Sequence, residues 1–263
     1  MAHVTLTNGL TQPPHQLTPS TPDKHILILN LMPNRAVTER QFTRMLEDAE
    51  TDATIQLTFC LPATHAIRRH AEAIHTAYTD FATIRDQSFD ALIVTGAPLD
   101  RIAFADVDYW DEFREILAWR HDHIKESLFL CWGADAAGFA DGVFTPTQLT
   151  QKITGIYQAG PVIMPQSRYF TIPCDSLTRG TIVAGTPELG ALIVRDDDAR
   201  STYVSGHFEY FTGTLADEYH RDRHRNGDAA PRPEHYFDAN MQVHNTWHSS
   251  AVAFYTDWLS KLS

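Results

Sequence analysis

The chain has 263 residues, 43% of them hydrophobic, and its formal net charge at pH 7 is −12. This length and apolar content are enough to bury a large core, and they fit one large α/β domain or two small ones. A chain this acidic is a poor binder of phosphate backbones, so nucleic acid is excluded as a partner.

Strands and helices alternate along the sequence. Residues 1–23 are rich in Thr, Pro and Gln and lack apolar periodicity, so we interpret them as an extended N-terminal arm before a single domain over residues 24–263. The patterns predict strands at residues 25–32, 53–60, 89–95, 127–131 and 202–205, and helices at residues 38–49, 107–123, 212–223 and 251–262. Thr38 is the expected N-cap of the first helix. This rhythm predicts the α/β class, with a mostly parallel sheet and helices on both of its faces.

Apolar runs and cysteines indicate the compartment. The longest apolar runs are far shorter than the roughly 20 residues that a membrane span needs, and the N-terminus has no signal-peptide pattern. Cys60, Cys131 and Cys174 are widely spaced and form no C-x-x-C pattern, which argues against disulfides and against a zinc site. We therefore expect a cytoplasmic protein with no membrane association and no bound metal.

Cys131 stands where a predicted strand ends and a helix rich in Gly and Ala begins, in the segment LFLCWGADAAG. Open α/β folds place their ligands at this end of the sheet. The unpaired N–H groups of a helix N-terminus lower the pKa of a thiol there and can bind an oxyanion. We interpret Cys131 as a nucleophile, with a small buried core residue as the alternative, and Cys60 and Cys174 as structural.

The segment VSGHFEY supplies a base for this thiol. A nucleophilic thiolate needs a base, and the base needs a group that orients it. His207 and Glu209 are two residues apart after a predicted strand, so in an extended chain their side chains point to the same side. One such pair arises easily by chance among 14 histidines, but in combination with Cys131 it predicts a Cys–His–Glu triad.

Seven segments occur in the order that is typical of one family and cover most of residues 25–260. The chain resembles the homoserine O-acyltransferases of the type also called homoserine O-succinyltransferases. The resemblance implies a flavodoxin-like fold similar to that of the class I glutamine amidotransferases. The matching segments are ILNLMPNRAVTERQF (28–42), FDALIVTGAPLDRIAFADVDYW (89–110), LFLCWGADAAG (128–138), KITGIY (152–157), QSRY (166–169), VSGHFEY (204–210) and LADEYHRD (215–222).

The resemblance also implies roles for individual residues. The acyl-thioester cysteine of the family corresponds to Cys131, and its catalytic histidine and glutamate correspond to His207 and Glu209. Its substrate-contacting residues correspond to Lys152, Ser167 and Arg221. An arginine and a lysine suit the carboxylate of an amino-acid substrate.

The reaction implied by the family is acyl transfer from an acyl-CoA co-substrate to the side-chain hydroxyl of L-homoserine or L-serine. One methylene separates the two acceptors, and discrimination of that size is worth only about 1–3 kcal/mol, so both remain open. Such a step belongs to the biosynthesis of methionine or cysteine. We expect small-molecule substrates, no permanently bound cofactor, and a homodimer as the assembly.

Asp100 bears on the acyl donor. In the family, members that take succinyl groups have a glycine at this position, in the loop after the strand at 89–95, and acetyl-type members have a glutamate. A succinyl carboxylate about 4 Å from an ionised Asp100 would be repelled by roughly 4 kcal/mol at an effective dielectric constant near 20. Asp100 therefore predicts acetyl-CoA as the donor, with a solvent-facing turn residue as the alternative.

Three other functions stay open. A glutamine amidotransferase or a related cysteine hydrolase would use the same triad, although the elbow here lacks the first glycine and the glutamine of the G-x-C-x-G-x-Q pattern, having Phe129 and Asp135 there. The same transferase with succinyl-CoA is the second alternative. A metal-binding regulatory protein is the third, because His220 and His224 are spaced i, i+4 on a predicted helix.

Overall fold

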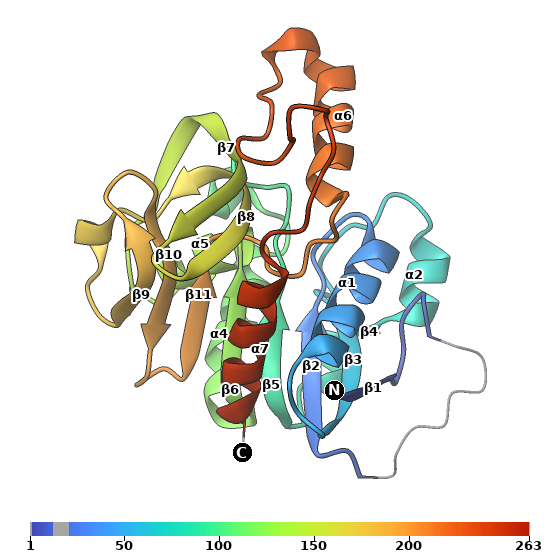
Figure 1. The fold of residues 1–263 in the computed structure, drawn as a ribbon. Coiled ribbons are helices and arrows are strands. Elements are labelled where there is room, and N and C mark those ends of the chain that lie inside the picture. Colours follow the sequence, from blue (N-terminus) through green and yellow to red (C-terminus); the bar gives the residue numbers. More distant parts are fainter. Residues whose placement is uncertain (1, 13–20, 263) are drawn as a thin grey trace.

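The alternating strands and helices assemble into a mostly parallel sheet, as the sequence predicts (Figure 1). The computed structural model describes residues 2–12 and 21–262. Within this part, four parallel strands form the centre of the sheet in the order β3-β2-β5-β6. They are β2 (Lys24–Leu29), β3 (Thr54–Leu61), β5 (Phe89–Val94) and β6 (Ile124–Leu130).

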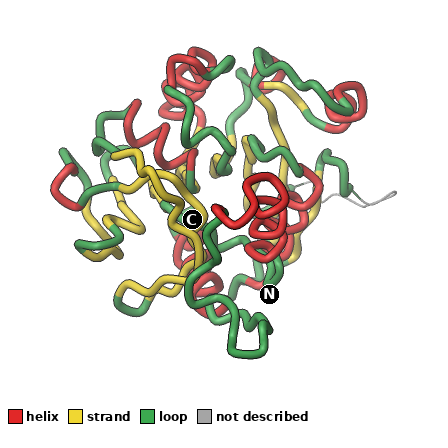
Figure 2. The backbone as a smooth tube through the Cα atoms, turned by 90° about the horizontal axis from the view of Figure 1, so that it is seen from above, coloured by secondary structure: helices red, strands yellow, loops and turns green. Residues whose placement is uncertain are grey.

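Helices cover both faces of this sheet, because successive side chains of a buried strand point to opposite faces. Ile26 and Ile28 of β2 belong to the apolar core beneath α1 and α7, whereas Leu27 and Leu29 belong to the core beneath α4 and α5. Figure 2 shows the helices from the end of the molecule at which α6 stands in Figure 1. The bounds are α1 Arg35–Asp48, α2 Ala71–Ala77, α3 Phe81–Ile84, α4 Trp110–His123, α5 Trp132–Ala140, α6 Thr214–Asn226 and α7 His248–Ser260.

The second half of the chain adds antiparallel structure. Strand β11 (Ser201–Val204) runs parallel to β6, and β10 (Gly190–Asp196) and β9 (Thr181–Thr186) continue the sheet in antiparallel fashion. Strands β7 (Thr147–Ala159) and β8 (Val162–Thr171) form a separate two-stranded ribbon. The elements predicted from the sequence do not include β7 to β10. Strand β7 is largely polar and β8 contains Pro165, whereas β10 (GALIVRD) is a buried apolar run that was missed.

The first helix starts earlier than expected. Helix α1 begins at Arg35 with Asn34 as its N-cap, so the prediction that Thr38 is the N-cap is wrong. Thr38 instead lies one turn inside the helix, where its hydroxyl donates to the Asn34 carbonyl oxygen. A threonine hydroxyl readily makes this bond to a carbonyl four residues earlier, which makes it easy to mistake for a cap.

The segment interpreted as an extended arm contributes a strand. Residues His3–Leu6 form β1, which pairs in parallel with β3 at the edge of the sheet, while residues 13–20 of this segment lie outside the described residues. The segment also holds the fully buried Glu39 of α1. Its carboxylate accepts hydrogen bonds from the backbone N–H groups of Leu10 (2.9 Å) and Thr11 (2.7 Å) and from the Tyr78 hydroxyl (2.7 Å).

Candidate active site

Cys131 lies on a strained elbow between β6 and α5. Its backbone has φ 48° and ψ −119°, and residues other than glycine rarely adopt such a positive φ. The N–H of Cys131 donates to the Val204 carbonyl oxygen (2.8 Å), and its own carbonyl accepts from the N–H groups of Ala134 and Asp135. The elbow is therefore fixed by backbone bonds on both sides, at the carboxyl end of the sheet, as nucleophile elbows are.

Gly96, two residues after the end of β5, packs against this elbow. A Cβ atom at Gly96 would lie 3.2 Å from the Cβ of Cys131 and 3.3 Å from Cε1 of His207. A side chain at this position would therefore press on both residues at once. The sequence predicts a strand that ends at residue 95, but the crowding that requires a glycine at the next position is visible only in three dimensions.

His207 and Glu209 follow β11, and the structure brings them to Cys131. The Nδ1 atom of His207 lies 2.7 Å from a carboxylate oxygen of Glu209, and both side chains are buried. The imidazole ring stacks on Tyr210, with 4.0 Å between ring centroids. Sequence reasoning missed Tyr210, although it ends the segment that supplied the other two residues.

The proton affinities of Cys131 and His207 are coupled. Burial raises the pKa of the Cys131 thiol, and neighbouring His207 opposes this only in part, so the expected lowering by the helix N-terminus is not the net result. Burial alone would lower the pKa of His207, but the Glu209 carboxylate and the Cys131 sulfur outweigh it and hold this pKa well above its usual range. The Glu209 carboxylate thus favours the charged form of His207, and a charged His207 favours the Cys131 thiolate.

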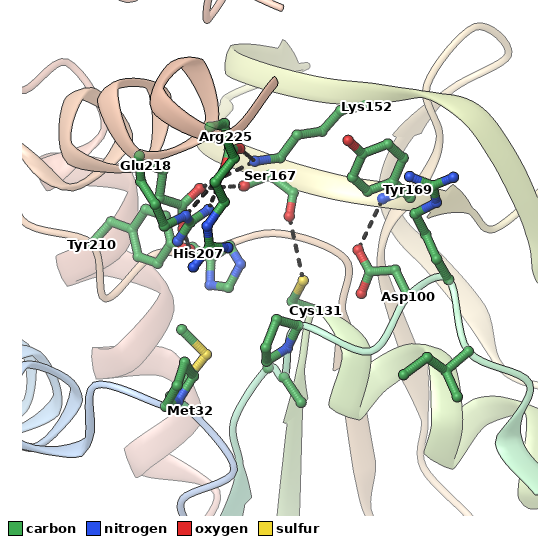
Figure 3. Close-up of a pocket in the computed structure, with 18 of the residues that line it drawn as sticks. Met32, Asp100, Cys131, Lys152, Ser167, Tyr169, His207, Tyr210, Glu218 and Arg225 are labelled. Carbon is green, nitrogen blue, oxygen red and sulfur yellow. Dashed lines mark hydrogen bonds and ion pairs between the residues drawn. The ribbon is translucent and has the colours of Figure 1, made fainter. Parts of the chain in front are cut away.

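A cavity of about 350 Å³ lies above these residues (Figure 3). Its floor consists of Gly96, Asp100, Cys131 and His207, in the segments that follow β5, β6 and β11. Glu209 does not line the cavity and supports His207 from outside it. Its cap is formed by side chains of the β7–β8 ribbon and of α6. The cap includes the three residues expected to contact substrate, Lys152, Ser167 and Arg221, together with Tyr169, Glu218 and Asp222.

Charged side chains of the cap form one network. The Nζ atom of Lys152 lies 2.8 Å from a carboxylate oxygen of Asp222 and 3.6 Å from one of Glu218. Glu218 also accepts hydrogen bonds from the hydroxyl groups of Ser167 and Tyr210. Arg221 pairs with the adjacent Asp222 and is half-exposed. The cap thus presents cations and a carboxylate to the same cavity, which suits a zwitterionic ligand.

Glu218 and Asp222 were missed in the sequence, although a signal was present. Glu218 lies three residues before Arg221 in the segment LADEYHRD, and residues three apart are neighbours on the surface of a helix. A carboxylate and a guanidinium at this spacing place both charges on one face of the helix, although such a pair also forms ordinary surface ion pairs.

Asp100 points into the cavity rather than to solvent (Figure 3). One of its carboxylate oxygens accepts a hydrogen bond from the Tyr169 N–H (3.0 Å), and the other is buried with no hydrogen-bond partner in the described part of the chain. Burial raises its pKa. Burial, with a contribution from the charge of Asp100, raises the pKa of the buried Asp135 to about 8. Asp135 lies in the first turn of α5, directly after the elbow, and its carboxyl group is neutral at pH 7.

The residues of the other hypotheses lie elsewhere. Cys60 is buried and Cys174 exposed, and both are free thiols. His220 and His224 stand on α6, and within residues 2–12 and 21–262 no group of three or more His, Cys, Asp and Glu side chains is arranged to hold a metal ion. None of the helices in those ranges is both long and apolar enough to cross a membrane.

Comparison with known sequences places this geometry in a family. The sequence model of the homoserine O-succinyltransferase family matches residues 20–262. The chain belongs to this family. The floor and the cap described above are therefore the candidate active site of a homoserine O-succinyltransferase family member.

Relatives in the family carry two names. A homoserine O-acetyltransferase of Leuconostoc mesenteroides is 44% identical over 250 residues, which cover 90% of this chain and 81% of the relative. A homoserine O-succinyltransferase of Proteus mirabilis is 36% identical over 255 residues, which cover 89% of this chain and 82% of the relative. The family is thus certain at this similarity, while the names of its members divide between two acyl groups.

A solved structure shares the fold of this family member. A glutamine amidotransferase of Thermotoga maritima superimposes with a TM-score of 0.56 at 10% sequence identity, covering 91% of this chain and 96% of the other. This likeness confirms the expected glutamine amidotransferase-like α/β fold. At so low an identity, it concerns the fold alone.

Proposed function

We propose that this protein transfers an acyl group from acyl-CoA to the side-chain hydroxyl of L-homoserine, as a step toward methionine, and that its preferred donor is acetyl-CoA. The observation that carries the proposal is that Cys131 and His207 line one cavity, with Glu209 at hydrogen-bond distance behind His207, in a chain of this family. L-Serine, the acceptor that is one methylene shorter, remains the alternative substrate.

The floor performs the chemistry in two steps. In the first, His207 takes the thiol proton as the Cys131 sulfur attacks the thioester carbon of acyl-CoA. The bond to the CoA sulfur then breaks, and the leaving CoA thiolate receives the proton from His207. In the second step, His207 takes the hydroxyl proton of the acceptor, whose oxygen attacks the new thioester. The bond to the Cys131 sulfur then breaks, and the departing thiolate takes the proton from His207. Glu209 holds the imidazole ring in place and stabilises its charged form.

An oxyanion forms in both steps. The N–H of Trp132 is the first donor of α5 after the nucleophile, and the residue in this position supplies an oxyanion-hole donor at other nucleophile elbows. The strained backbone of Cys131 aims the sulfur into the cavity while this N–H stays at the helix N-terminus. We assign the oxyanion to this N–H.

The cap binds the acceptor. Homoserine carries an ammonium and a carboxylate group, so it needs charges of both signs. Glu218 offers a carboxylate for the ammonium group, and Arg221 and Lys152 offer cations for the carboxylate. This arrangement would leave the hydroxyl free to reach the thioester on Cys131.

Asp100 supports the acetyl group as the preferred acyl group. It occupies the floor beside Cys131, so a succinyl group would have to place its own carboxylate near this side chain. The ionised form of Asp100 repels that carboxylate, and both forms fill space that a four-carbon acyl group needs. The raised pKa of Asp100 makes the charge effect stronger at higher pH.

Mass spectrometry of the intact protein tests the acyl-enzyme. After mixing with acetyl-CoA alone, we expect one added acetyl group on the wild type and on Cys174→Ser, which removes an exposed thiol outside the cavity. The group should be absent from Cys131→Ala, and steady-state kinetics should be ping-pong. An acetyl group retained on Cys131→Ala contradicts the mechanism.

Specificity constants test the substrates. We expect a higher kcat/KM for acetyl-CoA than for succinyl-CoA, and for L-homoserine than for L-serine. Asp100→Gly should raise the relative use of succinyl-CoA more than Asp100→Asn, which removes only the charge. A wild type that prefers succinyl-CoA would refute the role of Asp100 while leaving the acyl-enzyme intact.

A further inference from the structure

A second cavity, of about 720 Å³, adjoins the candidate active site. The two share part of their walls, namely Pro33, Ala97, Pro98 and Ile102, which line both. The second cavity is also lined by residues of the loop 62–70, by Arg35 at the start of α1, and by the segment 106–109, together with Asn30, Leu31, Leu61, Ile74 and Leu99. We call it the basic cleft, because Arg35, Arg68 and Arg69 all line it.

The loop 62–70 carries cations without partners. Arg68 and Arg69 are exposed, and in the described part of the chain neither forms an ion pair with a carboxylate. The two arginines are adjacent and line the same cavity as Arg35, so three guanidinium groups lie along one cleft. An anionic ligand of the cleft would account for them.

Carboxylates of α4 and of the segment before it hold the loop 62–70 in place. Glu112 of α4, which is nearly buried, accepts hydrogen bonds from the backbone N–H groups of Ala63 (2.7 Å) and Thr64 (2.8 Å). Asp108 pairs with His65 at 3.1 Å and accepts a hydrogen bond from the Ala66 N–H (3.0 Å). Of the two carboxylates that line the cleft, Asp108 is therefore already engaged, and only Asp106 stands against the three arginines.

Arg35 is the buried member of this set. Its exposed fraction is 7%, its Nε atom has no hydrogen-bond partner among the described residues, and burial lowers its pKa. Among its ionisable neighbours are the tyrosines Tyr78 and Tyr109. A buried cation is stable only when an anion or several acceptors compensate it. Arg35 thus indicates a ligand that brings negative charge into the cleft.

We infer that the basic cleft binds the phosphate groups of the acyl-CoA donor. This inference rests on the proposed function, which places the thioester of the same molecule at Cys131. The donor carries its phosphates at the end remote from the thioester, with the long pantetheine arm between them. The shared wall offers that arm an apolar path, since Ile102 is 43% exposed between the two cavities. Arginine guanidinium groups bind phosphate in bidentate fashion.

The test compares two donors with the same thioester, acetyl-CoA and S-acetylpantetheine, which lacks the phosphates at the remote end. For Arg68→Ala/Arg69→Ala, we expect the ratio of kcat/KM for acetyl-CoA to kcat/KM for S-acetylpantetheine to fall at least about tenfold, equivalent to about 1.4 kcal/mol. The matched control is Arg40→Ala/Arg114→Ala, which removes two exposed arginines from α1 and α4 outside the cleft and should leave the ratio unchanged. An unchanged ratio in the cleft variant, or an equal fall in the control, overturns the inference.

Calorimetry separates this inference from the proposed function. Titration of CoA into Cys131→Ala measures binding without chemistry, and the two cleft substitutions added to that variant should weaken binding at least about tenfold. If the wild type turns over neither donor, the proposed function fails, and the titration still decides whether the cleft binds CoA. Equal affinities with and without Arg68 and Arg69 would overturn the cleft assignment even in an active enzyme.

Discussion

The floor and the cap of the cavity are built in different ways. Floor residues stand at or just after the ends of sheet strands, and Cys131 is fixed there by backbone hydrogen bonds and a strained elbow. Cap residues come from a ribbon and a helix, and side-chain ion pairs such as that of Lys152 with Asp222 connect these elements. The comparison indicates that the reacting groups depend on the backbone of the fold, whereas recognition of the acceptor depends on a network that a ligand can rearrange.

The largest effect is expected on the floor, from Glu209→Gln. The amide keeps the size of the side chain but removes the charge partner of His207, so kcat should fall between about a hundredfold and ten-thousandfold. Thermal melting should show a folded protein, and Glu188→Gln, an exposed carboxylate remote from the cavity, serves as the control. Near-normal turnover of Glu209→Gln would mean that this carboxylate does not orient the base.

A smaller effect, of a different kind, is expected in the cap from Glu218→Gln. Loss of the charge opposite the acceptor ammonium should raise KM for the amino acid by about 10–100-fold, the value of one charge-assisted hydrogen bond. Acetylation of Cys131 by acetyl-CoA alone should keep its rate, which rapid-quench mass spectrometry can follow. A slower acetylation step would remove the distinction between floor and cap.

Gly96→Ala tests whether the positions of the reacting groups on the floor are sensitive to small displacements. The added methyl group would contact Cys131 and His207 at 3.2 and 3.3 Å, so one of them must shift by a few tenths of an ångström. We expect kcat to fall about tenfold, because small displacements of reacting groups are costly, with little change in KM for the acceptor. Gly213→Ala, where a methyl group meets no atom within 4 Å, is the control.

The last prediction concerns the free energy of unfolding and its dependence on Asp135, which is buried behind Cys131. The pKa of Asp135 is raised to about 8 by burial and by Asp100, so between its unfolded value of 3.8 and about 8 the native state binds one more proton than the unfolded state. The free energy of unfolding of the wild type therefore falls as pH rises through this window. Asp135→Asn removes that loss, so it should stabilise the protein more at pH 8 than at pH 5. Urea unfolding at both pH values measures the difference, and an equal effect at both would contradict an uncharged Asp135.

The sequence predicted the floor better than the cap. Buried strands such as β5 and β6 are short apolar runs, and Cys131, His207 and Glu209 lie at or just beyond the ends of such runs, where local pattern and ligand position coincide. The ribbon strand β7 is mostly polar, because it covers a cavity rather than a core, and period-2 patterns cannot find such a strand.

Contacts that depend on tertiary packing could not be read from the sequence. Nothing local indicates that Gly96 meets Cys131, because the two are distant in the chain. Nor does it indicate that Arg35 is buried with its Nε atom unpartnered among the described residues. The pKa of Cys131 is a further case: the helix N-terminus suggested a lowered value, but the depth of burial, which only the fold determines, raises it.

The N-terminal segment has a consequence for biogenesis. Residues 3–11 leave the ribosome before their partners, Glu39 and β3, so this segment docks only after the partners have been made. A chain without residues 3–11 would lack the N–H groups that donate to the buried Glu39 carboxylate. That carboxylate contacts Tyr78, which neighbours Arg35 of the basic cleft. Proteolytic loss of this segment would therefore impair use of the donor while Cys131 and His207 keep their places.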